Sequence, residues 1–238
     1  MSSARNVPRT LLAEIAIALK PLGYFLAPDR SLNRRPTADG VEHWMTLNFI
    51  ARPPRSVGAT FGVTESVGAM LGHEALCRFD PLRYGAVATQ MTPVRLTGTP
   101  LGALAGWVER AGLLVDDVPP RVVAEEIALA VERHVVPFAL SVVTLSDLLA
   151  LLLRNESPFE WYRGNGAIRA AAISSLGTRV GWPPQRIRDA VAPFLRYVKE
   201  GLGRHAIVSP EDFVDRIIEE ASIAQSASDA NGRVPRSD

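Results

Sequence analysis

Two neighbouring stretches decide the fold, VEHWMTLNFIA at residues 41–51 and VGATFGV at residues 57–63. Alternate residues of the first stretch fall on one face, namely His43, Met45, Leu47 and Phe49. The second stretch alternates apolar residues with small or polar ones in the same way. A period of two is typical of an antiparallel strand with one buried face. Asp39-Gly40 is a hairpin signal between two predicted strands, Ser31–Pro36 and Val41–Ala51, and Arg52-Pro53-Pro54-Arg55 ends the second of them.

A helix precedes these strands and helices follow them. Residues 8–22 place leucine, isoleucine and alanine at helical spacing, and Gly23 supplies a stop. Tyr84 to Met91 is a further strand candidate, and from Thr99 the apolar period changes to 3.6. The sequence therefore predicts an α+β fold, in which an N-terminal helix lies on an antiparallel β-meander of three or four strands and an all-helical C-terminal half follows.

Cap signals divide the C-terminal half into helices. They are Thr99-Pro100, which opens a helix to Gly112, then Pro119-Pro120, Thr144-x-x-Asp147, Trp182-Pro183-Pro184 and Ser209-Pro210-Glu211-Asp212. The last helix is predicted to end near Ser222, because the residues after it lack apolar periodicity. The predicted parts are an α+β part at 1–98, a helical part at 99–222 and a disordered tail at 223–238.

The composition is that of a globular protein with a core. Of 238 residues, 47% are hydrophobic, and 26 basic against 25 acidic residues give a net charge of +1. The apolar share excludes a mostly disordered chain. The net charge is too small to create an overall electrostatic field that would attract nucleic acid or a membrane surface. The single cysteine, Cys77, excludes an internal disulfide and a multi-cysteine zinc site. Only two of the basic residues are lysines, Lys20 and Lys199, and all the others are arginines. This composition indicates a GC-rich, bacterial coding sequence.

A cytoplasmic location is expected, since residues 1–8 lack the layout of a signal peptide and only one thiol is present. Residues 135–153 are nearly apolar and have the length of a membrane span. Thr144 and Asp147 interrupt this run with a charge and a helix start. We therefore expect a buried core helix there and no membrane association.

The sequence supports no catalytic, cofactor-binding or metal-binding residue. It has no P-loop and no dinucleotide-binding glycine motif, and Gly164-Asn165-Gly166 is interpreted as a turn. His73-Glu74-Ala75-Leu76-Cys77 resembles half of a zinc helix, but no other ligand cluster accompanies it. Ser174-Ser175-Leu176-Gly177 lacks the first glycine of a nucleophile elbow and lies within a helix. The carboxylates at Glu125 and Glu132 share a helix face, as ordinary solvated side chains also do.

Charge is the one uneven feature. Residues 163–204 carry eight basic and two acidic side chains, or +6, whereas residues 211–238 carry three basic and seven acidic ones, or −4. An aromatic residue among arginines is typical of binding hot spots. The candidate partner-binding residues are therefore Trp182, Arg179, Arg186, Arg188, Arg196 and Lys199. The alternative is that these arginines pair within the chain, with Glu211, Asp212, Asp215 and Glu219.

Several stretches carry a resemblance to a family. They are Leu19-Lys20-Pro21-Leu22-Gly23-Tyr24, Asn33-Arg34-Arg35, Trp44 to Ile50, Val57 to Val63, and the stretch from Val136-Pro137-Phe138 to Leu149. Residues 8–153 resemble an uncharacterised bacterial family of small α+β proteins, some of which occur in toxin–immunity neighbourhoods. The family has no established active site. The resemblance implies an accessory or immunity-like binding protein.

The leading hypothesis is a non-enzymatic protein-binding module that has no cofactor and whose basic surface favours an acidic protein partner. Two alternatives stay open: a hydrolase or metal-dependent enzyme with a scattered site, and a nucleic-acid-binding protein that uses residues 163–204. The sequence selects neither the partner nor the oligomeric state.

Overall fold

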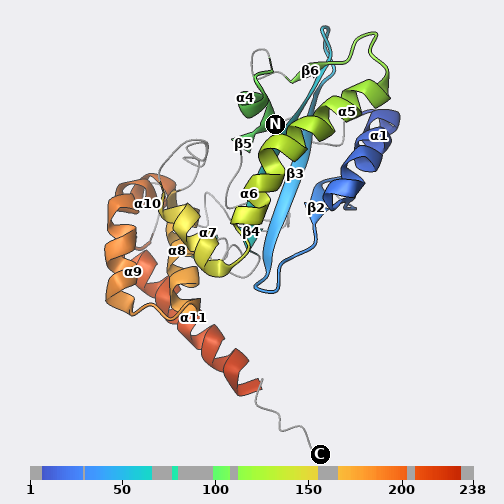
Figure 1. The fold of residues 1–238 in the computed structure, drawn as a ribbon. Coiled ribbons are helices and arrows are strands. Elements are labelled where there is room, and N and C mark those ends of the chain that lie inside the picture. The colour runs from blue at the N-terminus through green and yellow to red at the C-terminus, as the bar shows by residue number, and fades with distance from the viewer. Residues whose placement is uncertain are drawn as a thin grey trace, which may run out of the picture. The chain divides into compact units, whose positions relative to one another are not determined.

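The computed structural model describes residues 7–28, 30–65, 77–79, 99–107, 112–154, 166–202 and 207–231 (Figure 1). The chain forms two compact units. Unit 1 consists of Met1–Thr64, Thr97–Asp147 and Ser157–Trp161, and unit 2 of Glu65–Leu96, Leu148–Glu156 and Tyr162–Asp238. The helices between residues 101 and 141, which the sequence assigned to the helical part, thus belong with the sheet.

Unit 1 contains an antiparallel sheet in the predicted meander order. Its strands are β1 Tyr24–Leu26, β2 Leu32–Arg34, β3 Val41–Ile50, β4 Ser56–Glu65, β5 Thr99–Pro100 and β6 Leu113–Leu114. The order is β1-β2-β3-β4-β5, and β6 also pairs with β4. Met45, Leu47 and Phe49 are buried on one face of β3, as the period of two predicts. The predicted strand at 84–91 lies outside the described residues.

Two helices share the buried face of the sheet. α1, at Arg9–Leu19, continues into a 3₁₀ turn at Lys20–Leu22, and α5 spans Pro120–Ala130. α1 and α5 lie side by side (Figure 1). Ile15 of α1, Ile127 of α5 and Phe61 of β4 belong to one buried cluster, which is the core of unit 1. The predicted helix on the sheet is confirmed, and a second helix completes the cover.

Thr99-Pro100 is not a helix start. Thr99 pairs with Phe61 of β4, so this dipeptide forms the edge strand β5. The helix α4 begins at Leu101 and ends at Ala105, where Gly106 takes a positive φ of 70°. The predicted helix to Gly112 was therefore too long, because a left-handed glycine satisfies the C-terminal carbonyls and reverses the chain.

The segment after α5 continues through a π-helical turn, Val131–Val135, into α6, Val136–Ser141. Pro137 lacks a backbone N–H and its ring would clash with a carbonyl of an ordinary preceding turn, so the widened turn accommodates it. α7, Leu145–Leu153, begins at the predicted capping box. Thr144 Oγ1 accepts from the Asp147 backbone N–H at 3.1 Å, and Asp147 accepts from the Thr144 backbone N–H at 2.9 Å.

The apolar run at 135–153 is thus two short helices, α6 and α7, separated by residues 142–144. Within the described ranges, no single helix is long and apolar enough to cross a membrane. The helical stretches Pro120–Ser141 and Leu145–Leu153 reach that length and apolar character only when they are taken together, and they are bent by 108° at the break between them.

Unit 2 is helical. Its main elements are α8 Gly166–Arg179, α9 Pro184–Val191, a 3₁₀ turn at Ala192–Phe194, α10 Leu195–Leu202 and α11 Pro210–Asn231. α8 packs against α9, α10 and α11. Its residues 170–172 are alanines with no exposed surface, and small side chains let the neighbouring helices approach closely. Phe213 of α11 is also fully buried and meets Phe79 edge to face.

The last helix is longer than predicted. Ser209 caps it as expected, because its Oγ accepts from the Asp212 backbone N–H at 3.0 Å. The helix then continues to Asn231 instead of ending near Ser222. No proline or glycine interrupts residues 211–231. Ser222 and Ser226 donate to carbonyls one turn earlier, so their hydroxyls do not compete with the helix. Residues 223–231 of the predicted tail are therefore helical, and residues 232–238 lie outside the described ranges.

Candidate functional site

The predicted partner-binding surface contains one stacked pair, which we call the Trp182–Arg186 stack. Trp182 follows Gly181, which has a positive φ of 80°, in the turn between α8 and α9. Its backbone N–H donates to the Gly177 carbonyl at 2.8 Å. The guanidinium carbon of Arg186 lies 4.0 Å from the centroid of the Trp182 ring. This is a cation–π contact, in which the negative face of the indole attracts the cation.

The neighbouring residues Gly177 and Ile187 hold the ring of Trp182 in place. A Cβ at Gly177 would lie 3.4 Å from the Trp182 ring and 3.0 Å from Ile187, so the missing side chain leaves room for both. Trp182 is half-buried and Arg186 is exposed. Arg186 forms no ion pair with any carboxylate that the structure describes. The stack therefore presents a cation, which no described carboxylate pairs, on an ordered aromatic ring.

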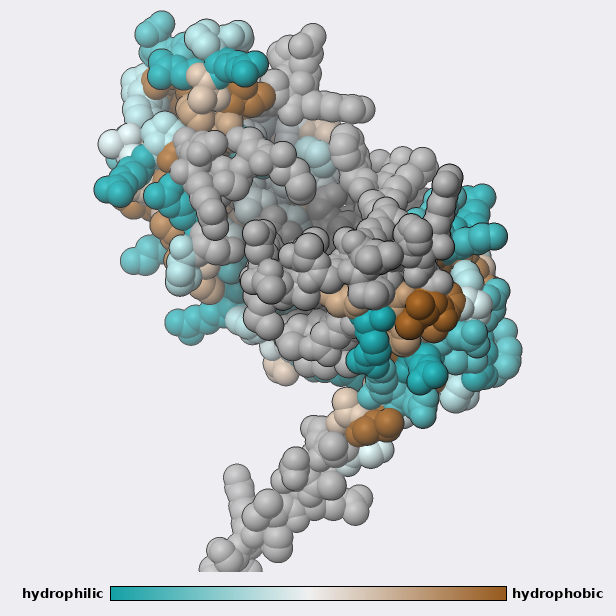
Figure 2. Space-filling view, turned by 180° about the vertical axis from the view of Figure 1, so that it is seen from behind, coloured by the Kyte–Doolittle hydropathy of each residue, from teal (hydrophilic) through white to brown (hydrophobic). Residues whose placement is uncertain are grey.

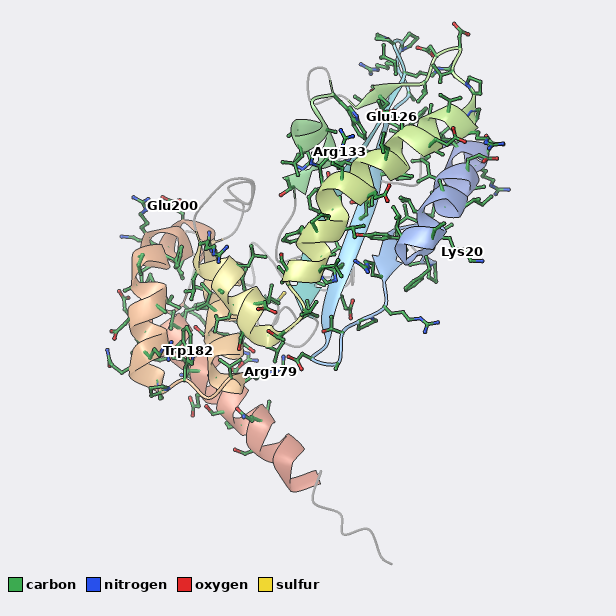
Figure 3. All side chains as sticks on the ribbon, in the orientation of Figure 1. Lys20, Glu126, Arg133, Arg179, Trp182 and Glu200 are labelled. Atoms are coloured by element: carbon green, nitrogen blue, oxygen red, sulfur yellow. The ribbon has the colours of Figure 1, made fainter. Side chains whose placement is uncertain are left out.

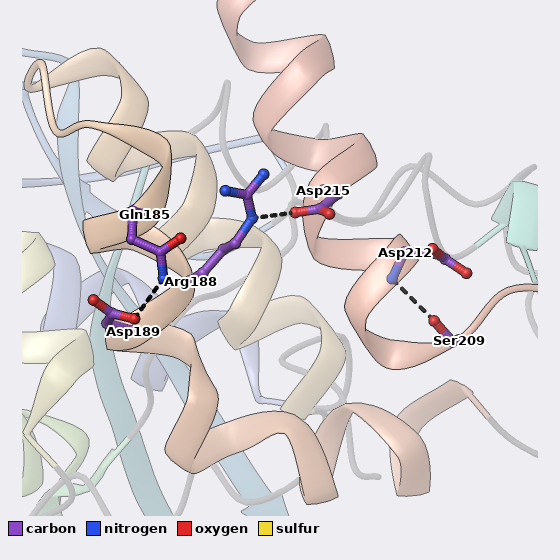
Figure 4. A network of polar contacts seen from close by, with 6 residues as sticks. All are labelled: Gln185, Arg188, Asp189, Ser209, Asp212 and Asp215. Atoms are coloured by element: carbon purple, nitrogen blue, oxygen red, sulfur yellow. Dashed lines mark hydrogen bonds and ion pairs between the residues drawn. The ribbon is translucent and has the colours of Figure 1, made fainter.

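Arg188 pairs with an acidic residue of the same chain, as the alternative interpretation of the basic region predicts. Its Nε donates to Asp215 of α11 at 2.7 Å (Figure 4). The same figure shows that the Gln185 amide donates a hydrogen bond to Asp189 within α9, and that the backbone N–H of Asp212 donates to the Ser209 hydroxyl. Among the four acids that the sequence offered as partners, Asp215 is the one that Arg188 contacts. Arg188 thus joins two helices of unit 2.

The other candidates lie on two further helices of unit 2, α8 and α10. Arg179 ends α8, three residues before Trp182, and is half-buried. Arg196 and Lys199 are exposed on α10. Figure 3 shows Glu200, the neighbour of Lys199, at the end of the helical unit away from Trp182. Of the candidate residues, the structure therefore brings Arg186 onto the ring of Trp182. The predicted inward residues of α9 and α10 are buried: Ile187, Val191, Phe194 and Val198.

One arginine of the basic region is in the core. Arg169 is only 9% exposed, and its Nε donates to the Leu152 carbonyl at 2.8 Å. Its Nη2 donates to the carbonyls of Leu152 and Arg154, at 2.7 Å for the latter. The guanidinium also lies 4.4 Å from the Phe194 ring centroid. Arg169 thus satisfies the carbonyls at the end of α7, and its charge is not part of a surface.

The structure describes only part of the motifs that the sequence analysis considered for enzymatic chemistry. His73, Glu74 and residues 164–165 lie outside the described ranges, and Cys77 is half-buried and forms no disulfide. The part of the chain that can be described holds no group of three metal-binding side chains. Ser174 is fully buried and donates to the Ala170 carbonyl at 2.8 Å, as a serine within a helix does. Glu125 is exposed and pairs with Arg121 on its own helix.

His43 is a buried titratable group of unit 1, as is Tyr24. It lies on β3 with 4% of its surface exposed, and its ring meets Phe138 edge to face at 6.4 Å. Burial and the neighbouring charge of Arg34 lower the pKa of His43 to about 4, against a smaller effect of a backbone hydrogen bond at Val142. His43 is therefore a neutral core residue at pH 7. Among the described residues, His43 belongs to no group of three or more His, Cys, Asp or Glu side chains that could hold a metal ion.

A basic pocket in unit 1 was missed by the sequence analysis. Its described lining residues are Lys20, Gly23, Tyr24, Phe25, Arg34 and Arg35, and its volume is about 630 Å³. Lys20 begins the 3₁₀ turn after α1 and extends away from the ribbon (Figure 3). β1 and β2 pair so that Tyr24 faces Arg34. The cross-strand register therefore brings together residues of two segments that the sequence analysis quoted but did not combine.

Exposed apolar side chains do not define another site. Ile17, Leu140, Ile207 and Ile223 are among the most exposed. Figure 2 shows hydrophobic residues distributed among hydrophilic ones on the face it presents. Singly exposed apolar side chains are ordinary on protein surfaces.

No family model, curated protein or solved structure matches this chain. Among the described residues, we infer a function from the Trp182–Arg186 stack and from the basic pocket.

Proposed function

We propose that the protein is a cytoplasmic, non-enzymatic binding module that takes an acidic protein partner at the Trp182–Arg186 stack. The observation that carries this proposal is the 4.0 Å contact between the Arg186 guanidinium and the Trp182 ring, on the exposed side of the α8–α9 turn. Tryptophan and arginine are the side chains that most often dominate binding energy at protein interfaces.

The chemistry of the stack favours a carboxylate on the partner. Arg186 keeps its hydrogen-bond donors available, because a ring face accepts the cation without using the planar edge of the guanidinium. That edge can donate two parallel hydrogen bonds to the two oxygens of a carboxylate. Trp182, which Gly177 and Ile187 hold in place, loses little side-chain freedom on binding.

An immunity-like role, in which the partner is a toxin that the module neutralises, is the form of this proposal that the family resemblance favours. The resemblance covers residues 8–153, so it concerns the sheet and α1, α4, α5, α6 and α7 and not the stack. The family resemblance and the Trp182–Arg186 stack therefore support the proposal independently of each other.

The test compares two arginines of α9. The full chain and its variants Arg186→Glu, Trp182→Ala and Arg188→Glu are used as baits for proteins of the source organism, and each captured protein is then purified and titrated. We expect one acidic protein whose affinity falls at least about tenfold in Arg186→Glu and in Trp182→Ala, as for a hot spot. Arg188→Glu is the matched control, because Arg188 is already paired with Asp215.

Equal binding by Arg186→Glu and by the unchanged chain would contradict the proposal. A salt series on the same complex separates the alternative partner. An affinity for duplex DNA or RNA that exceeds the affinity for any protein would favour the nucleic-acid-binding alternative, since phosphate contacts give a steep salt dependence.

A further inference from the structure

The basic pocket of unit 1 carries an inference of its own, independent of the Trp182–Arg186 stack. Lys20, Arg34 and Arg35 place three positive charges around it, and its described lining contains no carboxylate. None of the three forms an ion pair with a described residue. Like charges that gather around one cavity create a positive potential, which a bound anion relieves.

We propose that this pocket binds a small phosphorylated ligand with a planar ring, of the nucleotide class. The first support is geometry. Arg34 lies over the ring of Tyr24, 5.8 Å from its centroid, so its guanidinium is partly held before a ligand arrives. A planar guanidinium donates two parallel hydrogen bonds to a phosphate, whereas Lys20 adds a point charge.

The second support is the aromatic side of the pocket. Tyr24 is buried with 2% of its surface exposed, whereas Phe25, the next residue of β1, is 46% exposed. β1 is the edge strand of the sheet, so nothing in the described sheet covers it on its outer side. An exposed ring at the wall of a basic pocket provides a stacking surface for a planar base.

The third support is size and access. The pocket is a depression that is wide open to solvent, and its volume of about 630 Å³ lies within the range of roughly 300–1,000 Å³ that is typical of small-molecule sites. Gly23, which has a positive φ of 85°, also lines the pocket, and the guanidinium of Arg34 lies beside it, 3.5 Å from where a Cβ would stand. A single inorganic phosphate would leave most of this volume empty, which is why a ring-bearing phosphate fits the pocket better.

The test is a calorimetric titration of the full chain with pyrophosphate and with ATP at low salt. We expect both to bind, with ATP the tighter ligand because its base contacts Phe25. Phe25→Ala lowers the affinity for ATP to that for pyrophosphate and leaves pyrophosphate binding unchanged. Lys20→Gln combined with Arg35→Gln lowers both affinities at least about tenfold, as expected for lost phosphate contacts. Both cations are exposed, so their replacement leaves the fold intact.

Arg133→Gln is the matched control, because Arg133 is an exposed cation of the same unit outside the pocket (Figure 3). An equal loss of binding in Arg133→Gln would overturn the proposal, since it would indicate a general charge effect. Absence of heat for both ligands at about 1 mM would overturn it as well. Binding to phosphatidylserine vesicles without binding to either soluble phosphate would assign the pocket to lipid headgroups and reject the nucleotide.

Discussion

Arg188 Nε donates to a carboxylate oxygen of Asp215 at 2.7 Å and thereby joins α9 to α11. The side chains are 46% and 51% exposed, so solvent screens the pair and its contribution is small, about 0.2–1 kcal/mol. We expect Arg188→Glu to lower the unfolding free energy of unit 2 by about 1 kcal/mol, because it also adds a like-charge contact. Urea denaturation of Arg188→Glu, Asp215→Arg and the double variant measures the coupling. Strict additivity of the two single changes would show that the pair contributes nothing.

The core arginine is expected to matter far more than the surface pair. Replacing Arg169 with methionine keeps much of the apolar stem but leaves the carbonyls of Leu152 and Arg154 without this donor. We expect a loss of about 2–3 kcal/mol in unfolding free energy, because the lost hydrogen bonds are charge-assisted and buried. Lys199→Met, at an exposed position on α10, is the control and should change stability by less than about 0.5 kcal/mol. A similar effect of both changes would refute the assigned role of Arg169.

Stability is expected to depend on pH through His43. Its pKa is about 4 in the folded protein and about 6.5 when the chain is unfolded. Between these values the unfolded chain binds a proton that the folded protein does not, so the unfolding free energy falls as the pH is lowered from about 6.5 to about 4. The loss amounts to about 3 kcal/mol at most. Thermal unfolding of the unchanged chain and of His43→Gln over this pH range tests it, and an identical slope in both proteins would exclude His43 as the cause.

A single glycine beside the sheet is expected to tolerate no side chain. Gly112 has a φ of 94°, and a Cβ there would lie 2.1 Å from the carbonyl oxygen of Val57. The next residue, Leu113, pairs with Val57, so any relief of the clash disturbs the β4–β6 pairing. We expect Gly112→Ala to lower the unfolding free energy by at least about 3 kcal/mol.

Gly40→Ala is the control for this change. Gly40 has a φ of 80° but nothing lies within 4 Å of its added Cβ, so only the cost of the left-handed conformation remains, about 1–2 kcal/mol. Chemical denaturation of both variants separates the clash from the conformational cost. Equal losses would mean that the approach to Val57 is not a constraint.

The candidate sites differ in how much of each the sequence contains. Trp182 and Arg186 are four residues apart across a helix start, so their proximity follows from local geometry, and the sequence analysis named both. The pairing of Arg188 with Asp215 depends on how α9 packs on α11, and the sequence could offer only four acids without choosing among them. The basic pocket depends on the register of β1 with β2, which charge counting along the chain does not reveal.

What the sequence determined by itself is local. Alternation at 41–51 and 57–63, the Asp39-Gly40 turn, and the caps at Thr144 and Ser209 each depend on neighbours within a few residues, and all are found in the structure. The tertiary structure decided which elements meet. It placed α5 beside α1 on the sheet and recruited Thr99-Pro100 to an edge strand. It also buried Arg169 against carbonyls of α7. Such contacts depend on packing between segments far apart in the chain, and side-chain periodicity shows only that a face is apolar, not which partner covers it.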